Sequence, residues 1–187
     1  SPPACMKAVA DKLRQYHPAN VVIDPVMFAK NGDALMDPAS VGALIETVLP
    51  FADVLTPNVP EAQYLANMEI RTPEDMEQAA RKIGALGCRN VLVKGGKNIE
   101  GAVDVLFDGE ICHRLEIEQL DSTSTHGTGC TLSSAIASNL ALGKSVPEAV
   151  RLAKEYVTDA IRRAPGLGHG CGPLDHFCHI FDRSDLK

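Results

Sequence analysis

Short runs of β-branched and aliphatic residues alternate with longer amphipathic runs along most of this chain. This alternation constrains the fold more than any other feature of the sequence. The runs NVVIDPVM (20–27), ADVLTPN (52–58) and NVLVKGG (90–96) are nearly continuous in apolar residues, which is typical of buried strands. Amphipathic stretches of helical length separate them. Strands and helices in this order predict an α/β fold, with a largely parallel sheet covered by helices on both faces.

Each predicted strand ends at, or is followed by, polar or charged residues that could bind a ligand. The first ends at Asp24, and the second is followed by Asn58, which can cap a short helix with Glu61 at its third position. The third runs into Lys94 and a glycine turn. Ligands of parallel sheets bind at the carboxyl ends of the strands. We therefore expect these four side chains to converge on one rim of the sheet.

The remaining elements follow from turn and capping signals. Residues 102–117 alternate about an Asp-Gly turn, which predicts an antiparallel hairpin. Ser145 and Glu148 have the spacing of a capping box at a helix start. From Pro165 onward the chain is rich in Gly, Pro and His, which is typical of a loop. The expected helices span residues 37–49, 72–87, 128–142 and 145–163.

Length and composition limit the class of protein. The 187 residues suit one domain, 1–187, or most of one. The formal charge of -6, without a Lys/Arg cluster, argues against nucleic acid and anionic membranes as partners. No apolar run approaches the roughly 20 residues that span a bilayer. The six cysteines are scattered through predicted helices and strands, which favours reduced thiols. The opening residues look like a helix entered in mid-chain, so we expect an upstream segment to be missing.

The stretch THGTGC (125–130) predicts an anion site. Gly127 and Gly129 let the backbone approach a ligand, and the N–H groups of Thr128, Gly129 and Cys130 would point out of a helix N-terminus. The helix dipole there also favours a thiolate, which could accept a proton or act as a nucleophile. The alternative is a glycine-rich helix start with a small, packed cysteine. The stretch is not a Walker A motif.

The side chains of the predicted rim allow two interpretations each. Asp24 could hold Mg²⁺ directly or through water, or simply form a turn beside proline. Glu61 could serve the metal or cap its helix, and Lys94 could neutralise phosphate or remain solvated. His126 could contact phosphate or donate a proton, or stabilise its loop. Two carboxylates, a lysine and an anion hole together are the components of a phosphoryl-transfer site.

The C-terminal segment GHGCGPLDHFCHIF invites a zinc interpretation. Its spacing fits no paired Cys or His motif with a second ligand pair elsewhere in the chain. Loop packing and a glycine turn near the site are therefore favoured over a metal. The residues concerned are His169, Cys171, His176, Cys178 and His179.

Six motifs in this order resemble the hydroxymethylpyrimidine/phosphomethylpyrimidine kinases of the thiamine pathway. They are VVIDPVM, LTPNVPEAQYL, VLVKGG, VDVLFDG, THGTGCTLSSAIASNLALG and GLGHGCGPLDHF, and they span about residues 21–177. The resemblance implies a three-layer αβα ribokinase-like fold, with a mostly parallel sheet and an antiparallel hairpin. Family members begin with a glycine-rich strand and βα units that hold the pyrimidine. This chain is expected to lack those first units and to keep the nucleotide half.

The resemblance also implies roles for the residues after the third strand. Cys130 matches the position of the catalytic base, where most ribokinase-like kinases have aspartate. Gly127, Thr128 and Gly129 match the anion hole for the transferring phosphoryl group. Lys94 matches the lysine that contacts the ATP phosphates.

Residues in the first part of the chain are implied to serve the metal. Asn58 and Glu61 match the N-x-x-E motif that organises Mg²⁺ and its waters, and Asp24 matches an aspartate near the metal.

Thr125 and His126 are assigned to ATP and phosphate binding. The helix over residues 150–157 would border the adenine pocket.

The expected activity is ATP-dependent phosphorylation of hydroxymethylpyrimidine and its monophosphate, with Mg²⁺ as cofactor and a small-molecule pyrimidine as partner. Pyridoxal kinase is an alternative, and a non-catalytic nucleotide-binding fragment is another. By analogy with the family, a cytoplasmic homodimer is expected.

Overall fold

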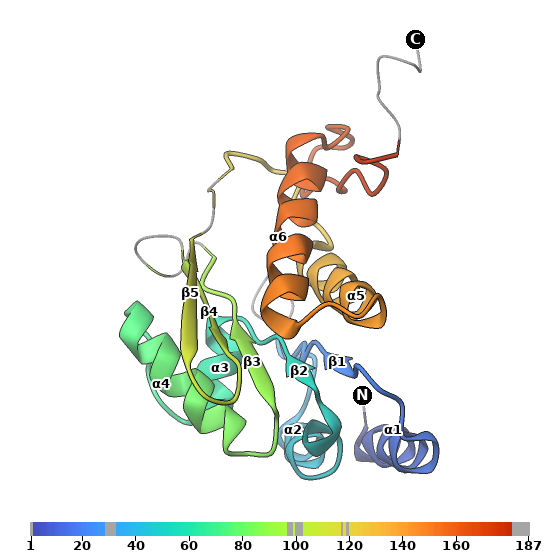
Figure 1. Ribbon diagram of the computed structural model, residues 1–187, viewed down its shortest axis with the longest axis vertical. Helices are drawn as coiled ribbons and strands as arrows, with labels where there is room; N and C mark the ends of the chain where they lie inside the picture. The colour runs from blue at the N-terminus through green and yellow to red at the C-terminus, as the bar shows by residue number, and fades with distance from the viewer. Residues whose placement is uncertain are drawn as a thin grey trace. The chain divides into compact units, whose positions relative to one another are not determined.

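The computed structural model describes residues 2–28, 33–96, 99, 103–116, 118 and 120–180. The chain divides into two compact units, Ser1–Ile117 and Glu118–Lys187, and each is described by itself below (Figure 1). The prediction of one domain over residues 1–187 stays a prediction.

The first unit is built on a five-stranded sheet with the order β1-β2-β3-β4-β5. The strands β1, β2 and β3 are parallel, and β4 is antiparallel to both β3 and β5, so only β4 runs against the others. The predicted mostly parallel sheet with an antiparallel hairpin is confirmed. The strands are β1 Val22–Ile23, β2 Val54–Leu55, β3 Asn90–Val93, β4 Val103–Phe107 and β5 Cys112–Glu116.

The first strand differs from its prediction as a buried strand. Val22 and Ile23 are only half-buried, whereas every residue of β2 and β3 is buried. The cause is position, because β1 is the end strand of the described sheet and its only pairing there is with β2.

Helices with well-formed caps connect these strands. Asp37 accepts a hydrogen bond from the Ser40 N–H, and Asn58 and Thr72 each begin a helix with a complete capping box. The predicted helix from residue 37 continues through a π turn and a 3₁₀ turn. The elements are α1 Pro3–Tyr16, α2 Pro38–Ala43, η1 Leu44–Val48, η2 Leu49–Phe51, α3 Val59–Ala66 and α4 Pro73–Gly84.

An aliphatic core holds this unit together. Leu55, Val91 and Val105 of the sheet belong to one buried cluster with Leu49 and Ile83 of the helices. Figure 1 shows α4 lying against β3 and β4, and these elements are in contact. Packing on one face of the sheet thus fixes the ends of its strands, where the candidate site residues lie.

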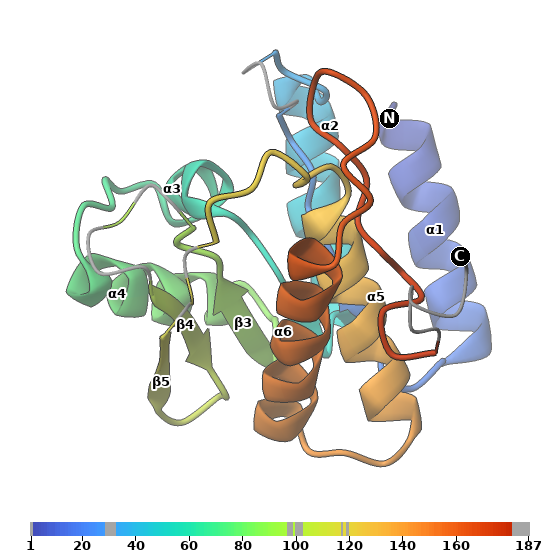
Figure 2. The same cartoon turned by 90° about the horizontal axis from the view of Figure 1, so that it is seen from above.

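The described residues of the second unit form two helices, α5 Thr128–Ala141 and α6 Val146–Arg162. They pack side by side, as Figure 2 shows. The capping box predicted at Ser145 is wrong, because Ser145 makes no side-chain cap and Glu148 instead pairs with Lys144 at 3.1 Å in the described structure. After α6 the chain is irregular up to residue 180, as predicted, and returns to α6 through Leu174 and Cys178.

All six cysteines are free thiols, in agreement with the prediction. Among the described residues, none of the helices is both long and apolar enough to cross a membrane.

Candidate functional site

The structure brings two of the predicted rim residues into direct contact. Lys94, just after β3, donates from Nζ to Oδ1 of Asp24, just after β1, at 3.0 Å. Thr56, at the end of the intervening strand β2, donates to the same oxygen at 3.2 Å. The Lys94 and Asp24 side chains are 17% and 13% exposed. The parallel alignment of the three strands therefore creates a partly buried ion pair at their carboxyl ends.

Glu61 is held by backbone N–H groups beside this pair. Its Oε2 accepts from Asn58 N at 2.8 Å and its Oε1 from Met27 N at 3.2 Å. The Asn58 side chain completes the box by accepting from Glu61 N at 2.9 Å. The structural role that the sequence left open for this motif is thus present. Glu61 also ties the segment after β1 to the start of α3.

The electrostatics of Glu61 link it to both neighbours. The residue is 1% exposed, and this burial raises the pKa of its carboxyl group. The Asn58 N–H, the Lys94 charge and the Met27 N–H oppose that rise in pKa, while the negative charge of Asp24 adds to it. Asp24, Lys94 and Glu61 therefore form one coupled cluster of two carboxylates and a cation.

The donor chemistry of this cluster fits Mg²⁺. The ion prefers oxygen ligands and usually binds through one or two carboxylates together with phosphate oxygens and water. Asp24 and Glu61 supply such carboxylates, and Asp24 is the more exposed of the two. In the part of the chain that the structure describes, no three His, Cys, Asp or Glu residues gather closely enough to form a metal site by themselves.

The turn after Lys94 rests on a residue that the sequence analysis did not single out. Gly95 N donates to Oδ1 of Asp104 in β4 at 2.8 Å. The signal was available in the run AVDVLF, because Asp104 is a charged residue inside an apolar strand pattern. Lys94 N donates to Pro57 O at 2.8 Å, so the backbone here is fixed on both sides.

The glycine loop of the second unit begins α5 as predicted. Gly127 is the N-cap residue with φ 82°, a left-handed conformation that favours glycine. As a glycine it has no side chain to cap the first turn, whose N–H groups belong to Thr128, Gly129 and Cys130. Thr128 Oγ1 donates to Thr125 O at 2.9 Å, which closes the loop. This geometry suits an anion at the start of a 14-residue helix.

The C-terminal segment supports this loop. His126 N donates to Gly172 O at 3.1 Å, while the His126 side chain is exposed. A Cβ atom at Gly172 would lie 2.8 Å from Ser124 Oγ and 3.2 Å from Leu167 O, so the two segments approach closely because residue 172 is glycine. The glycine turn predicted near the site is thus a packing partner of the loop.

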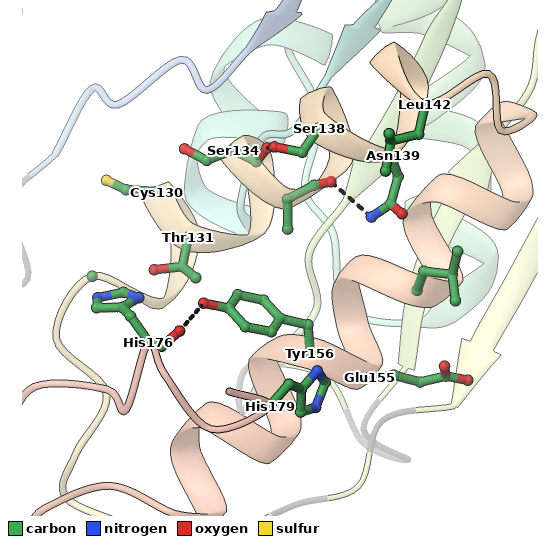
Figure 3. A pocket seen from close by; sticks show the side chains of 13 residues that line it. Cys130, Thr131, Ser134, Ser138, Asn139, Leu142, Glu155, Tyr156, His176 and His179 are labelled. Atoms are coloured by element: carbon green, nitrogen blue, oxygen red, sulfur yellow. Dashed lines mark hydrogen bonds between the residues drawn. The ribbon is translucent and has the colours of Figure 1, made fainter. Parts of the chain in front are cut away.

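Cys130 is exposed in the first turn of α5 and lines a cavity of about 860 Å³ (Figure 3). The cavity lies among α5, α6 and the C-terminal segment. Besides Cys130 it is lined by Gly127, Thr131, Ser134, Ala135, Ser138, Asn139, Leu142, Leu152, Glu155, Tyr156, His176 and His179.

One wall of this cavity is aromatic. The Tyr156 hydroxyl donates to His176 O at 2.9 Å, and the rings of Tyr156 and His179 meet edge to face with centroids 5.6 Å apart. His179 Nε2 in turn lies 3.0 Å from Asp159 Oδ2. Aromatic, aliphatic and small polar groups in one cavity suit a flat heteroaromatic ring.

The other members of the C-terminal His/Cys group lie elsewhere. His169 and Cys171 are exposed, and Cys178 is buried against Ala160 and Leu174. His176 and His179 line the cavity, although no sequence motif placed them in a pocket. The only pointer in the sequence was the expected adenine border at 150–157, which contains three of the lining residues, Leu152, Glu155 and Tyr156.

Comparison with known proteins places the chain among small-molecule kinases. The profile of the phosphomethylpyrimidine kinase family matches residues 2–175. The chain is 48% identical over 179 residues to the thiamine biosynthesis bifunctional protein ThiED of Geobacter sulfurreducens, covering 95% of this chain and 36% of that protein. It is 46% identical to a hydroxymethylpyrimidine/phosphomethylpyrimidine kinase of Synechococcus elongatus, covering 86% of this chain and 62% of the relative.

A solved structure agrees with this grouping. An ADP complex of Bacillus subtilis pyridoxal kinase matches with a TM-score of 0.85 at 40% identity, covering 95% of this chain and 66% of that one. The ribokinase-like fold and the resemblance seen in the sequence are confirmed. The chain spans between 36% and 62% of the length of the two relatives named above.

Proposed function

The chain belongs to the phosphomethylpyrimidine kinase family, and from this premise we propose that it acts as an ATP-dependent kinase of thiamine diphosphate biosynthesis. The acceptors would be hydroxymethylpyrimidine and then its monophosphate. The observation that carries the proposal is the position of Cys130, exposed in the first turn of α5 behind a glycine loop and lining a large cavity.

In the first transfer, Cys130 is the proposed base. The oxygen of the acceptor hydroxyl forms a bond to the γ-phosphorus of ATP, and its proton passes to the Cys130 thiolate. The bond between that phosphorus and the bridging oxygen breaks, and ADP leaves with the electron pair. The thiol then loses its proton to solvent. In the second transfer an ionised phosphate oxygen of the monophosphate forms the bond to the γ-phosphorus, so no proton has to be removed, and ADP again leaves with the electron pair.

The glycine loop is proposed to stabilise the charge that develops on the phosphoryl group. The N–H groups of Gly127, Thr128 and Gly129 would donate to its oxygens, in the field of the helix dipole. Thr125 supports this loop because its carbonyl holds the Thr128 hydroxyl. The exposed side chain of His126 is proposed to reach a phosphate of ATP.

The cluster at the strand ends is proposed to bind the remaining phosphates. Lys94 would contact phosphate as a cation, and Asp24 and Glu61 would hold Mg²⁺ or its waters, with Asn58 fixing Glu61. When bound, Mg²⁺ supplies positive charge that favours departure of ADP. The aromatic wall around Tyr156 is proposed to receive the adenine ring.

Pyridoxal kinase is the second candidate activity. It is favoured by the Bacillus subtilis pyridoxal kinase structure, which is 40% identical with a TM-score of 0.85. A nucleotide-binding fragment without turnover is a third candidate, since the chain spans only 36% and 62% of the length of the two curated relatives named above.

The test is ADP release from MgATP with hydroxymethylpyrimidine, its monophosphate and pyridoxal as separate acceptors. Turnover with the pyrimidines supports the proposed activity, and turnover with pyridoxal alone supports the second candidate. Binding of ATP without ADP release supports the fragment.

The role of Cys130 is tested by Cys130→Ala. Loss of a general base lowers kcat by about 10²- to 10⁴-fold, while the KM for MgATP stays close to that of the wild type. The matched control is Cys5→Ala, which removes an exposed thiol from α1 and leaves kcat unchanged. Full activity of Cys130→Ala would contradict the proposed base.

We also propose a homodimer that works in the cytoplasm. Six free thiols suit a reducing compartment. The dimer is proposed only by analogy with ribokinase-like enzymes, which are often dimers. Light scattering on the purified protein measures the mass and decides between monomer and dimer.

A further inference from the structure

Asp104 is a buried carboxylate in the middle of a strand. It lies in β4 between Val103 and Val105, faces Leu115 of β5 in the register, and is 4% exposed. A carboxylate is costly to bury unless it accepts hydrogen bonds. Asp104 Oδ1 accepts one from Gly95 N at 2.8 Å, across nine positions of the chain.

Gly95 and β4 approach too closely for any other residue. A Cβ atom at position 95 would lie 2.0 Å from Val103 O. Glycine therefore lets the turn after β3 rest on the backbone of β4, and the bond to Asp104 fixes it there. This contact joins the strand hairpin to the residue that follows Lys94.

Lys94 is consequently fixed through its backbone. Its own N–H donates to Pro57 O at 2.8 Å, and the next N–H along the chain is held by Asp104. These two bonds orient the backbone from which the Lys94 side chain extends. A lysine side chain has many rotamers in solution, yet here its Nζ lies 3.0 Å from Asp24 Oδ1.

We propose that Asp104 is a positioning residue for Lys94. By holding the peptide between Lys94 and Gly95, it keeps the Lys94 ammonium group beside Asp24, where the proposed function requires a cation for the ATP phosphates. The consequence for ATP rests on that proposed function. The consequence for the position of Lys94 does not, and it is measured without nucleotide.

The decisive experiment is competitive acetylation of lysines by acetic anhydride, read by mass spectrometry. In the wild type Lys94 reacts more slowly than Lys144, which is 41% exposed in its side chain. In Asp104→Ala the Lys94 rate rises about 3- to 10-fold, because the turn and the ion pair loosen. Asp104→Asn retains an oxygen acceptor and gives an intermediate rate. If the alanine variant does not fold, Asp104→Asn still tests the proposal.

The matched control is Asp108→Asn in the turn of the same hairpin. Asp108 Oδ1 also accepts backbone N–H groups, but these are the N–H groups of Glu110 and Ile111 in its own turn and not that of Gly95. This variant removes a hairpin carboxylate in the same way. It leaves the Lys94 rate unchanged, whereas a general loosening of the hairpin would raise it.

A second measurement connects the position of Lys94 to nucleotide. For an active protein, Asp104→Asn raises the KM for MgATP about 10-fold and leaves the KM for the pyrimidine unchanged. A merely structural role would lower the amount of folded enzyme and leave both KM values as they are.

The two proposals fail in different ways. If the wild type releases no ADP with any acceptor, the proposed function fails, and the acetylation rates still decide the role of Asp104. If Lys94 reacts at the wild-type rate in folded Asp104→Asn and Asp104→Ala, the positioning role is overturned, whatever the activity.

Discussion

Glu61 completes a helix cap, is buried, and is also proposed to hold Mg²⁺ or its waters. Its two carboxylate oxygens accept from Met27 N and Asn58 N, and the residue is 1% exposed. Burial raises the pKa of the carboxyl group above its usual value of 4.5, despite the Asn58 N–H and the nearby Lys94. A buried carboxylate with such a pKa gives a stability that depends on pH.

Glu61→Gln removes this titration and keeps the shape of the side chain. Because the pKa of Glu61 is higher in the folded protein, the native state binds more protons than the unfolded chain between the two pKa values. The contribution of Glu61 is full below about pH 4.5 and is lost as pH rises through the folded pKa. We expect the unfolding free energy of the wild type, minus that of Glu61→Gln, to fall over this range.

Urea unfolding followed by circular dichroism, from pH 4.5 to 8, measures the difference. Glu69→Gln is the control, because Glu69 is 76% exposed in its side chain and pairs only at the surface with Arg71. Its difference from the wild type stays flat. A difference for Glu61→Gln that grows with pH would mean that the two N–H bonds outweigh burial.

At the scale of elements, helix starts show what local sequence can and cannot predict. The capping box of Asn58 and Glu61 was expected and is formed. The same pattern at Ser145 and Glu148 is not, because Glu148 binds Lys144 four residues before it. The Ser-x-x-Glu spacing permits a capping box. A nearby charged side chain such as Lys144 can compete for the glutamate, and the box then does not form.

The site was predictable where the order of strands dictates it. Asp24 and Lys94 follow parallel strands, so their contact follows from the topology. Tyr156 and His179 meet only because the C-terminal segment turns back onto α6 through buried Cys178. No local pattern encodes that return. Asp104 needed the close approach of Gly95 to β4, which is also a tertiary contact.

The return of the C-terminal segment predicts the effect of Gly172→Ala. The added methyl group would press on Ser124 and Leu167 O, which costs about 1–3 kcal/mol of stability. It also strains the bond from His126 N to Gly172 O and hence the glycine loop. We expect a lower unfolding free energy in urea and a higher KM for MgATP.

Gly170→Ala is the matched control two residues away. A Cβ atom at Gly170 meets nothing within 4 Å, so the change stays within about 0.5 kcal/mol of the wild type. Equal effects of the two variants would show that the segment is sensitive to any added methyl group, and that the contact with Ser124 carries no special weight.

At the scale of the whole molecule, the proposed residues are divided between two compact units. Asp24, Glu61 and Lys94 belong to Ser1–Ile117, and the glycine loop with Cys130 belongs to Glu118–Lys187. A ligand that binds only the folded state stabilises it by mass action, whichever residues it contacts. Nucleotide binding therefore tests both groups of residues in one experiment.

We expect the magnesium complex of a non-hydrolysable ATP analogue, at about 100 times its Kd, to raise the unfolding free energy by about 2.7 kcal/mol. EDTA should remove most of this gain, since Asp24 and Glu61 are proposed to act through Mg²⁺. Under the proposed function, amide hydrogen exchange also slows at Lys94 and Gly95 in one unit and at Thr128 and Cys130 in the other. Slowing in the second unit alone would show that the loop binds nucleotide without the strand-end cluster. Asp24, Glu61 and Lys94 would then remain a structural cluster whose ion pair and capping box stabilise the fold.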